Sequence, residues 1–488
     1  MKLYADVTRE IDEMPEGPEI VAFFDLDGTL LSGFSVTSMM RERLSSGELK
    51  PRQALVQFVS FIGQGFRSRE FPAMLKAATR TLEGVEEASF VRLGRETFRK
   101  YVSGAIYPES RALVRAHQRK GHTVVVLSSA TPYQVNPVAE ELDIEHLLCT
   151  RFEVEEGRFT GRLVEPITYG EGKLTAARKF LKARRLKLAN SFFYTDGAED
   201  VPLLEHVGYP RPLNPDGDLE EVAEERGWPI RRFHSRGLPG VREVLGTGLA
   251  WGALVSSALA SVPVLALNRS RRDAANLAIA TFGDFASALA GLDLQVTGEQ
   301  HLWSHRPAVF VFNHQSGADM VILAKLLRQD FTGIAKKELR SNPILGPLMW
   351  ATETVFIDRA NTEQAIEAMR PAVETLKSGL SIVLAPEGTR SLSDRLGPFK
   401  KGAFHLAMQA GVPMVPIVIH NATDALPKSG IFVRPAIIKV EILPPVPTDD
   451  WEAETIDQHV RAVRRMFLKA LDQMPEPGEE EISNNNKI

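Results

Sequence analysis

The sequence predicts an α/β protein with two domains and an apolar helical segment between them. Short apolar runs of strand length alternate with stretches of helical spacing on both sides of residues 244–268. The length of 488 residues corresponds to two to four domains at about 150 residues each. The composition is 44% hydrophobic and 25% charged, which excludes disordered and low-complexity classes.

Charge and cysteine content exclude further classes. The chain has 58 Lys and Arg against 62 Asp and Glu, and this balance gives no global case for nucleic-acid binding. Cys149 is the single cysteine, so an intrachain disulfide framework and a Cys-rich zinc site are both excluded. The first 20 residues contain no apolar core, so we expect no secretory signal peptide and a cytoplasmic N-terminus.

We expect the first domain over residues 1–240. Its buried strands end in polar residues and include VAFF before Asp25, HTVVVLSSA at 122–130 and NSFFYTDG at 190–197. Strands of this kind, separated by helical stretches, indicate a parallel sheet with its chemistry at the carboxyl ends of the strands. Residues about 32–105 have helical spacing and are expected to form a cap over that edge.

Carboxylates follow the first strand in DLDGTL, residues 25–30. Two carboxylates at a strand end can act as nucleophile and general acid/base, although the pair alone also occurs in exposed turns. Farther along, Ser128 could bind a phosphoryl oxygen, and Lys173 could offset the charge of a phosphate dianion. Asp196 and Asp200 could bind Mg²⁺, which prefers oxygen ligands. The four elements in this order predict phosphoryl transfer.

This ordered set resembles the haloacid dehalogenase (HAD) superfamily, in the branch with a helical cap between the first two motifs, over about residues 19–240. The resemblance implies a Rossmann-like core in which Asp25 attacks phosphorus and Asp27 protonates the leaving group. It also implies that Asp25, the backbone carbonyl of Asp27 and Asp196 hold Mg²⁺, with Asp200 in support. Asp200 could instead be a carboxylate at a helix N-terminus.

Two positions depart from one member of that branch. Phosphoserine phosphatases carry a Glu that pairs with the substrate ammonium, and Phe34 stands at that position here. Glu199 replaces the usual Asn of the fourth motif. An apolar ring cannot neutralise an ammonium group, so we do not expect phosphoserine to be the preferred substrate.

Residues 241–295 are expected to associate with a membrane. Residues 244–268 contain no charge and are long enough to span a bilayer, but glycines and Pro263 interrupt them. Arginines flank both ends, so a single span would violate the positive-inside rule. We therefore expect a hairpin bent near Pro263, with residues 274–292 alongside, and peripheral or monotopic attachment to the cytoplasmic face. A buried core helix of a soluble domain is the alternative.

A second α/β domain is expected over residues 296–475, followed by a disordered polar tail at 476–488. His314 and Asp319 follow its first strand, in NHQSGAD. Residues five apart lie on different faces of a continuous helix, because each residue turns about 100°. His314 must therefore precede the helix and Asp319 must lie in its first turn. A capping box between Ser316 and Asp319 would create that geometry, and the aspartate could then fix the imidazole tautomer.

Three further blocks follow: TVFIDR ending in Arg359, the strand and turn LAPEGTRS, and the apolar strand VPMVPIVI. The four blocks in this order resemble the glycerophospholipid acyltransferases over about residues 270–450. The resemblance implies that His314 deprotonates the hydroxyl of a lysophosphatidate, which then attacks the thioester of acyl-CoA or acyl-ACP. It further implies a substrate- and phosphate-binding set of Lys336, Arg359, Glu387, Gly388, Thr389 and Arg390. Within that set we expect Glu387 to orient the acceptor or the arginine.

Together these patterns predict a 1-acyl-sn-glycerol-3-phosphate O-acyltransferase of phospholipid synthesis fused to a Mg²⁺-dependent HAD phosphomonoesterase. Lysophosphatidate, an acyl donor and the lipid surface are the expected partners, and an acyl carrier protein is a candidate partner. Three alternatives stay open: acylation of another lipid acceptor, a regulatory or non-catalytic HAD domain, and a phosphatase whose second domain only anchors it to lipid.

Overall fold

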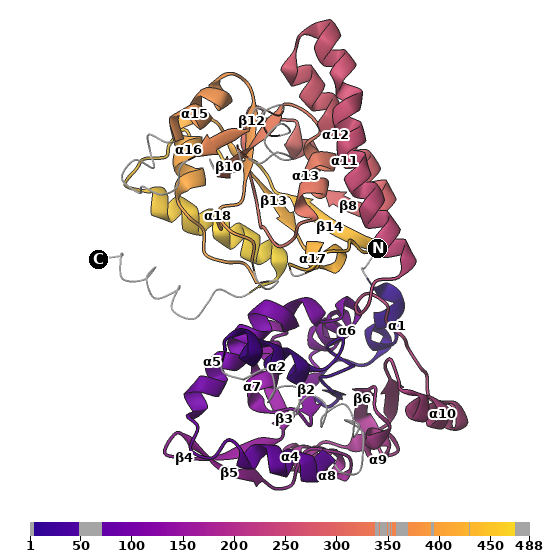
Figure 1. Ribbon diagram of the computed structural model, residues 1–488. Helices are drawn as coiled ribbons and strands as arrows, with labels where there is room; N and C mark the ends of the chain where they lie inside the picture. Colours follow the sequence, from indigo (N-terminus) through magenta and orange to yellow (C-terminus); the bar gives the residue numbers. More distant parts are fainter. Residues whose placement is uncertain are drawn as a thin grey trace. The chain divides into compact units, whose positions relative to one another are not determined.

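The computed structural model describes residues 4–47, 71–336, 341, 349, 352, 354–357, 369–391, 395–428 and 430–473. The chain divides into two compact units, Met1–Leu238 and Pro239–Ile488, called here the first and the second unit (Figure 1). The expected polar tail lies outside the described residues, as does part of the expected cap, residues 48–70.

The first unit is built around a parallel sheet, which confirms the predicted fold class. In the described residues the sheet has five strands in the order β3-β2-β1-β6-β7, so β1 is central. These strands are β1 Val21–Phe24, β2 Thr123–Ser128, β3 His146–Cys149, β6 Ser191–Thr195 and β7 Tyr209–Pro212. Because β1 lies in the middle, the residues that follow it reach the centre of the carboxyl edge.

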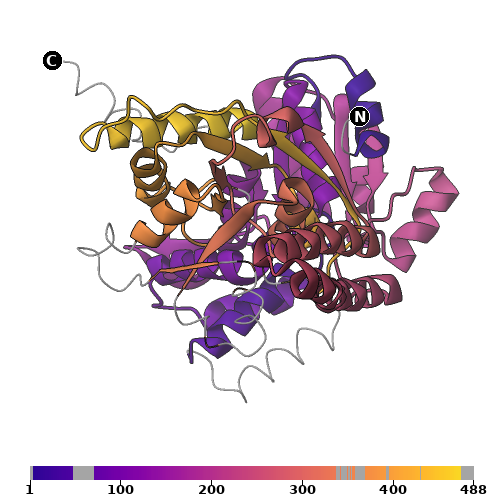
Figure 2. The ribbon, with the colours of Figure 1, turned by 90° about the horizontal axis from the view of Figure 1, so that it is seen from above.

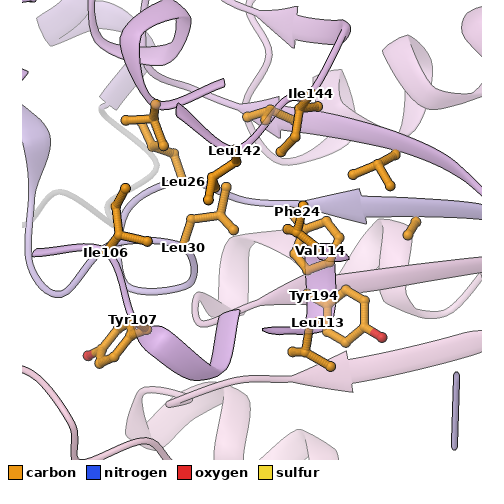
Figure 3. Packing of buried hydrophobic residues seen from close by; sticks show 14 of the residues in the cluster. Phe24, Leu26, Leu30, Ile106, Tyr107, Leu113, Val114, Leu142, Ile144 and Tyr194 are labelled. Atoms are coloured by element: carbon orange, nitrogen blue, oxygen red, sulfur yellow. The ribbon is translucent and has the colours of Figure 1, made fainter. Parts of the chain in front are cut away.

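Helices cover both faces of this sheet (Figure 1). Successive side chains of a strand point to opposite faces. Phe24 of β1 therefore packs in one core, where its ring stacks on Tyr194 at a centroid distance of 4.5 Å (Figure 3). Phe23 packs in the other core with Phe193. The helices of this unit are α1 Ala5–Glu13, α2 Ser35–Ser45, α4 Phe71–Arg80, α5 Glu87–Thr97, α6 Pro108–Arg119, α7 Pro132–Glu141, α8 Glu171–Arg184, α9 Val201–Leu204 and α10 Gly217–Arg226.

A smaller hydrophobic cluster lies apart from the two sheet cores. It joins α2 and α5 to α7 and to the antiparallel hairpin of β4 Arg151–Glu155 and β5 Arg158–Val164. Met39, Leu93, Tyr133 and Phe159 are its buried members. The helical segment after β1 therefore has a core of its own.

The second unit contains a mixed sheet. Its described strands follow the order β11-β10-β12-β9-β13-β14-β8, with β13 and β14 antiparallel and the other neighbours parallel. The strands are β8 Leu292–Thr297, β9 Val309–Phe312, β10 Phe331–Lys336, β11 Val355–Ile357, β12 Ser381–Leu384, β13 Met414–Ile419 and β14 Ala436–Ile442. The apolar β9 is fully buried between β12 and β13, and hydrophobic cores lie on both sides of the sheet.

The helices of the second unit include a long antiparallel pair. They are α11 Val241–Asn268, α12 Arg271–Ala290, α13 Asp319–Leu327, α15 Arg370–Lys377, α16 Gly402–Ala410, α17 Ala422–Ala425 and α18 Ile456–Leu471. Both ribbon views show α11 and α12 side by side (Figures 1 and 2), and α12 also packs on α13.

The hairpin turns later than the sequence predicts, so the expected bend near Pro263 is wrong. Proline removes one helical hydrogen bond, but α11 continues through Pro263 to Asn268. The chain reverses where Arg269 adopts a left-handed conformation and the Ser270 side chain caps α12 by accepting from the Asp273 N–H.

Helix α11 is long and apolar enough to cross a membrane, by length and composition. Only 11% of its most apolar window is buried, which does not fit the alternative of a buried core helix. Small residues such as Ala250 and Ala253 form the buried side. Large apolar side chains are exposed, among them Trp251, Val255 and Leu259.

Candidate active sites

Asp25 lies at the centre of the carboxyl edge of the first sheet. Its N–H donates to the Tyr194 carbonyl at 2.9 Å, so the pairing of β1 with β6 continues into the motif. One carboxylate oxygen accepts from the Leu26 N–H at 2.7 Å, and the other lies 3.1 Å from Lys173 Nζ. The carboxylate is thus held in place by a backbone amide and a cation.

Lys173 is buried between two carboxylates. Its Nζ lies 2.6 Å from Asp200 Oδ2, which also accepts from the Thr195 hydroxyl. Burial lowers the pKa of Lys173, but the charges of Asp200 and Asp25 outweigh it, and the net pKa is raised. Asp200 precedes α9 but its side chain makes no capping bond. Its side chain therefore holds Lys173 instead of capping the helix.

Asp27 carries a raised pKa. Desolvation, with the neighbouring charge of Asp25, raises the pKa of Asp27 to about 7, although hydrogen bonds from Ser35 oppose the shift. Asp27 accepts from the Ser35 N–H at 2.8 Å and from its hydroxyl at 3.0 Å. Gln134 in turn donates to the Ser35 hydroxyl oxygen at 2.9 Å. A carboxyl that keeps its proton near neutral pH suits a general acid.

Ser128 and Asp196 end two neighbouring strands of the same edge. Ser128 is buried at the end of β2, and its hydroxyl oxygen accepts from the Ala130 N–H at 3.3 Å. Asp196 follows β6, and its carboxylate lies directly against Gly28: a Cβ on that glycine would overlap Asp196 Oδ2. Asn214 Nδ2 donates to the Gly28 carbonyl at 3.0 Å. The DLDG and TDG turns therefore meet.

The donors at this edge fit a magnesium ion. All of them are oxygens, and Asp200 Oδ1 is buried with no hydrogen-bond partner among the described residues. No three His, Cys, Asp or Glu side chains in the described part of the chain form a metal-binding group. The implied set of Asp25, Asp196 and the Asp27 carbonyl contains only two such side chains.

The two departures from the phosphoserine phosphatase pattern lie beside this edge. Phe34 is 38% exposed and immediately precedes Ser35, which binds Asp27. Burial, together with the charge of Asp200, raises the pKa of Glu199 to about 7.

In the second unit, Asn313 anchors the loop that follows β9. Its side-chain amide donates to the Ile419 carbonyl at 2.7 Å, and its Oδ1 accepts from the Ile419 N–H at 2.8 Å. These two hydrogen bonds to Ile419, at the end of β13, fix the start of the NHQSGAD segment. Asn313 is not among the predicted site residues, and its place directly before His314 is its only signal in the sequence.

His314 and Asp319 form the contact that their spacing predicts. His314 Nδ1 lies 2.7 Å from Asp319 Oδ2, with the histidine in the loop and the aspartate at the start of α13. The expected capping box is only half formed. Asp319 accepts from the Ser316 N–H at 3.1 Å, but the Ser316 hydroxyl oxygen accepts from the Ala318 N–H instead of the Asp319 N–H. Burial raises the pKa of Asp319, against opposing hydrogen bonds from His314 and Ser316.

Glu387 binds backbone amides. One of its carboxylate oxygens accepts from the His314 N–H at 2.8 Å and the other from the Gly397 N–H at 2.9 Å. The Ser391 N–H donates to the His314 carbonyl at 2.7 Å. Both backbone polar groups of His314 are thus bound by the turn that carries EGTR. The expected pairing of Glu387 with an arginine is not among the described contacts.

Arg390 is half-buried beside the histidine loop. A Cβ on Gly317 would lie 3.8 Å from Arg390 Nη1, and this guanidinium pairs with no described residue. Gly388 has a positive φ of 76°, and Thr389 is exposed. Lys336 ends β10, but its side chain is not among those described, and Arg359 lies outside the described residues.

Comparisons with known proteins match a different family in each unit. Residues 22–205 match the haloacid dehalogenase-like hydrolase family and residues 293–420 the Acyltransferase family. A 1-acyl-sn-glycerol-3-phosphate acyltransferase of Limnanthes alba is 34% identical over 235 residues, which are 48% of this chain and 81% of that protein. A probable phosphatase of Mycobacterium tuberculosis is 33% identical over 216 residues, which are 43% of this chain and 75% of that protein.

A solved structure shows a weaker likeness. It is the 1-acyl-sn-glycerophosphate acyltransferase of Thermotoga maritima, 25% identical, with a TM-score of 0.40, covering 47% of this chain and 97% of that chain. The family matches and the two relatives confirm both resemblances found in the sequence. The chain belongs to the haloacid dehalogenase-like hydrolases through its first unit and to the acyltransferases through its second.

Proposed function

We propose that the second unit transfers an acyl group from a thioester to the free hydroxyl of lysophosphatidate, which makes phosphatidic acid for phospholipid synthesis. The observation that carries this proposal is the 2.7 Å contact of His314 Nδ1 with Asp319 Oδ2. When the Nδ1–H donates a hydrogen bond to Asp319, Nε2 becomes the basic nitrogen of the imidazole. The His314 side chain is 25% exposed, so a substrate can reach it.

The reaction needs no covalent acyl-enzyme. His314 Nε2 takes the proton of the acceptor hydroxyl while the hydroxyl oxygen attacks the thioester carbonyl carbon. The C–S bond then breaks, and the departing sulfur receives the proton from the imidazolium. Asp319 stabilises the imidazolium between these two steps. Acyl-CoA and acyl-ACP both present the required thioester.

The acceptor carries a phosphate that needs fixed positive charge. Arg390 has that charge within the EGTR turn, and no described residue neutralises it. Lys336 and Arg359 are proposed to join it, with Gly388 and Thr389 supplying the close-fitting turn. Glu387, which binds the backbone of His314, positions the base.

Acylation of lysophosphatidate tests this proposal, with acyl-CoA and acyl-ACP as donors. His314→Ala should reduce the rate by about two to four orders of magnitude, because general-base catalysis is lost. His305→Ala is the matched control, because His305 is an exposed histidine of the same unit. A His314→Ala enzyme as fast as the control contradicts the mechanism. Transfer to another lipid hydroxyl in preference to lysophosphatidate would support the first alternative.

We also propose that the first unit is a Mg²⁺-dependent phosphomonoesterase. Asp25 attacks phosphorus to form an aspartyl-phosphate, and Asp27, whose pKa is about 7, gives its proton to the leaving oxygen. Water then hydrolyses the aspartyl-phosphate, which releases phosphate and regenerates Asp25. Lys173, at 3.1 Å from Asp25, and Ser128 bind phosphoryl oxygens. Mg²⁺ held by Asp25, the Asp27 carbonyl and Asp196 would neutralise phosphate charge. Asp200 supports the site by holding Lys173.

Hydrolysis of a generic phosphomonoester tests the second proposal. Asp25→Asn and chelation of Mg²⁺ should each abolish it, while acyl transfer persists. Because Phe34 cannot pair with an ammonium group, phosphoserine should be hydrolysed no faster than simple phosphomonoesters. Wild-type protein without hydrolysis would favour a regulatory unit, and hydrolysis that survives both treatments would place the chemistry elsewhere.

Membrane attachment through α11 and α12 completes the proposed function. The exposed apolar side chains of α11 suit the interface of a bilayer, and the arginines at both ends suit its anionic headgroups. We propose peripheral or monotopic attachment with both units on the cytoplasmic face, where acyl donors and soluble phosphoesters occur.

A further inference from the structure

We infer that Lys400 is a further binding residue for the phosphate of the acyl acceptor. This inference rests on the proposed acyl transfer and adds a residue that the four sequence blocks do not contain. Lys400 lies in GPFKKGAF, after the EGTR block and before α16.

The end of the Lys400 side chain lies on the EGTR turn. A Cβ on Gly388 would be 2.9 Å from Lys400 Nζ and 3.0 Å from its Cδ. The Lys400 N–H donates to the Pro386 carbonyl at 2.8 Å. The Gly397 N–H also donates to Glu387. Two backbone N–H groups, of Gly397 and Lys400, thus hold the segment 397–400 on this turn. The ammonium of Lys400 therefore lies against the turn that binds the backbone of His314.

The positive charge of Lys400 is not neutralised within the described structure. Lys400 is exposed, and no ion pair joins it to a described residue. The guanidinium of Arg390, two residues beyond Gly388, likewise forms no ion pair with a described residue. Lys428 Nζ donates to the Arg390 carbonyl at 2.9 Å. Three cationic side chains therefore contact or extend from one turn.

This grouping suits a phosphomonoester. Such a group carries a charge of about −1.5 to −2 near neutral pH. An arginine can bind it with two parallel hydrogen bonds, and a lysine adds a mobile point charge. The positive φ of Gly388, 76°, and its lack of a side chain let the Lys400 side chain lie against the turn.

The neighbouring lysine provides an internal comparison. Lys401 is equally exposed on the surface, but its Nζ lies 2.8 Å from a carboxylate oxygen of Asp457 in α18. The charge of Lys401 is therefore paired with a carboxylate on the surface. Lys400 and Lys401 thus differ in surroundings, while a substitution at either changes the net charge by the same amount.

The test compares Lys400→Met with Lys401→Met in the full chain. Steady-state kinetics should show a roughly tenfold higher KM for lysophosphatidate in Lys400→Met, with kcat and the KM for acyl-CoA within about twofold of wild type. Lys401→Met should match wild type, and Lys400→Arg should restore most of the affinity. Acylation of monoacylglycerol, which lacks the phosphate, should not distinguish the two methionine variants.

Two outcomes overturn the inference. Equal KM values for lysophosphatidate in the two methionine variants would make Lys400 an ordinary surface lysine. A higher KM for acyl-CoA alone would assign Lys400 to the phosphates of the donor. Calorimetric binding of a short-chain lysophosphatidate reads the same contact without turnover. Binding therefore decides the role of Lys400 independently of turnover. A wild-type chain that transfers no acyl group would refute the proposed function and leave this binding test unaffected.

Discussion

The backbone N–H of His314 donates to Glu387 Oε1 at 2.8 Å, across 73 positions of the chain. This contact forms because His314 follows β9 and Glu387 follows β12, and these strands are parallel neighbours. The second oxygen of Glu387 accepts from the Gly397 N–H. A single buried carboxylate therefore joins the histidine loop to the turn that carries the proposed phosphate-binding residues.

Glu387→Gln should lower kcat for acyl transfer roughly tenfold and change the KM for lysophosphatidate little. Glutamine has one acceptor oxygen where glutamate has two, so either the His314 or the Gly397 N–H loses its partner. A buried unpaired amide costs about 1–3 kcal/mol of stability. Steady-state kinetics and urea unfolding measure the two effects. A large rise in the KM for lysophosphatidate with unchanged kcat would instead show that Glu387 contacts the acceptor.

Gly28→Ala should abolish phosphomonoester hydrolysis and leave acyl transfer intact. The new Cβ would overlap Asp196 Oδ2, so the proposed magnesium ligand must move. Gly33→Ala is the control, because Gly33 also has a positive φ, 88°, but open space around its Cβ position. Both variants should lose about 1–2 kcal/mol of folding stability, because alanine is strained in a left-handed backbone conformation. Hydrolysis assays should separate them; equal activity would argue against a strict position for Asp196.

His117 and His122 should each lower the stability of the first unit as the pH falls below about 6.5, the ordinary histidine pKa, whereas Asp27 and Glu199, with pKa values raised to about 7, act in the opposite direction. Burial lowers the pKa of His117 well below the ordinary histidine value, and it also lowers the pKa of His122. The two rings share a hydrogen bond of 2.8 Å. Between about pH 6.5 and the lowered pKa values, the unfolded chain binds protons that the native state does not. Each such histidine then costs up to about 1.4 kcal/mol per pH unit.

Urea unfolding at several pH values, read by hydrogen exchange in β1 and β2, measures this dependence. His117→Gln should make the free energy of unfolding rise less with pH between about pH 5 and 6.5 than in wild type, because one of the two histidine protonation differences is removed. His206→Gln, at an exposed position of the same unit, should keep the wild-type slope. The explanation fails if His117→Gln retains the wild-type slope.

Leu259→Asp combined with Leu267→Asp should release the protein from membranes. Both side chains are exposed on α11, at 66% and 83%, so the change removes apolar surface from the hairpin without opening a core. Ile431→Asp is the control, since Ile431 is 75% exposed outside the hairpin. Sedimentation with anionic vesicles measures binding, and circular dichroism checks folding.

The topology has its own test. Protease applied outside intact cells should cleave neither unit, because a hairpin on the cytoplasmic face leaves both inside. Cleavage of only one unit would mean that α11 spans the membrane and that the two units face opposite compartments.

The sequence by itself determined the α/β class and the positions of the candidate catalytic motifs. Asp25 follows a short apolar strand, and the chain order of strands and helices indicates a parallel sheet whose carboxyl edge carries such residues. The contact of His314 with Asp319 was also predictable, because helix geometry limits how residues five apart can meet. These inferences depend on local spacing, which the sequence displays directly.

Only the tertiary structure decided which distant groups meet. Glu387 binds the backbone of His314, Asp200 holds Lys173, and Lys400 lies on Gly388, although their spacing in the chain shows none of this. The hairpin likewise turns at Arg269 and not at Pro263. The physical reason is that local periodicity specifies each helix and strand separately, whereas the order of strands in a sheet and the packing of its turns depend on all of them together.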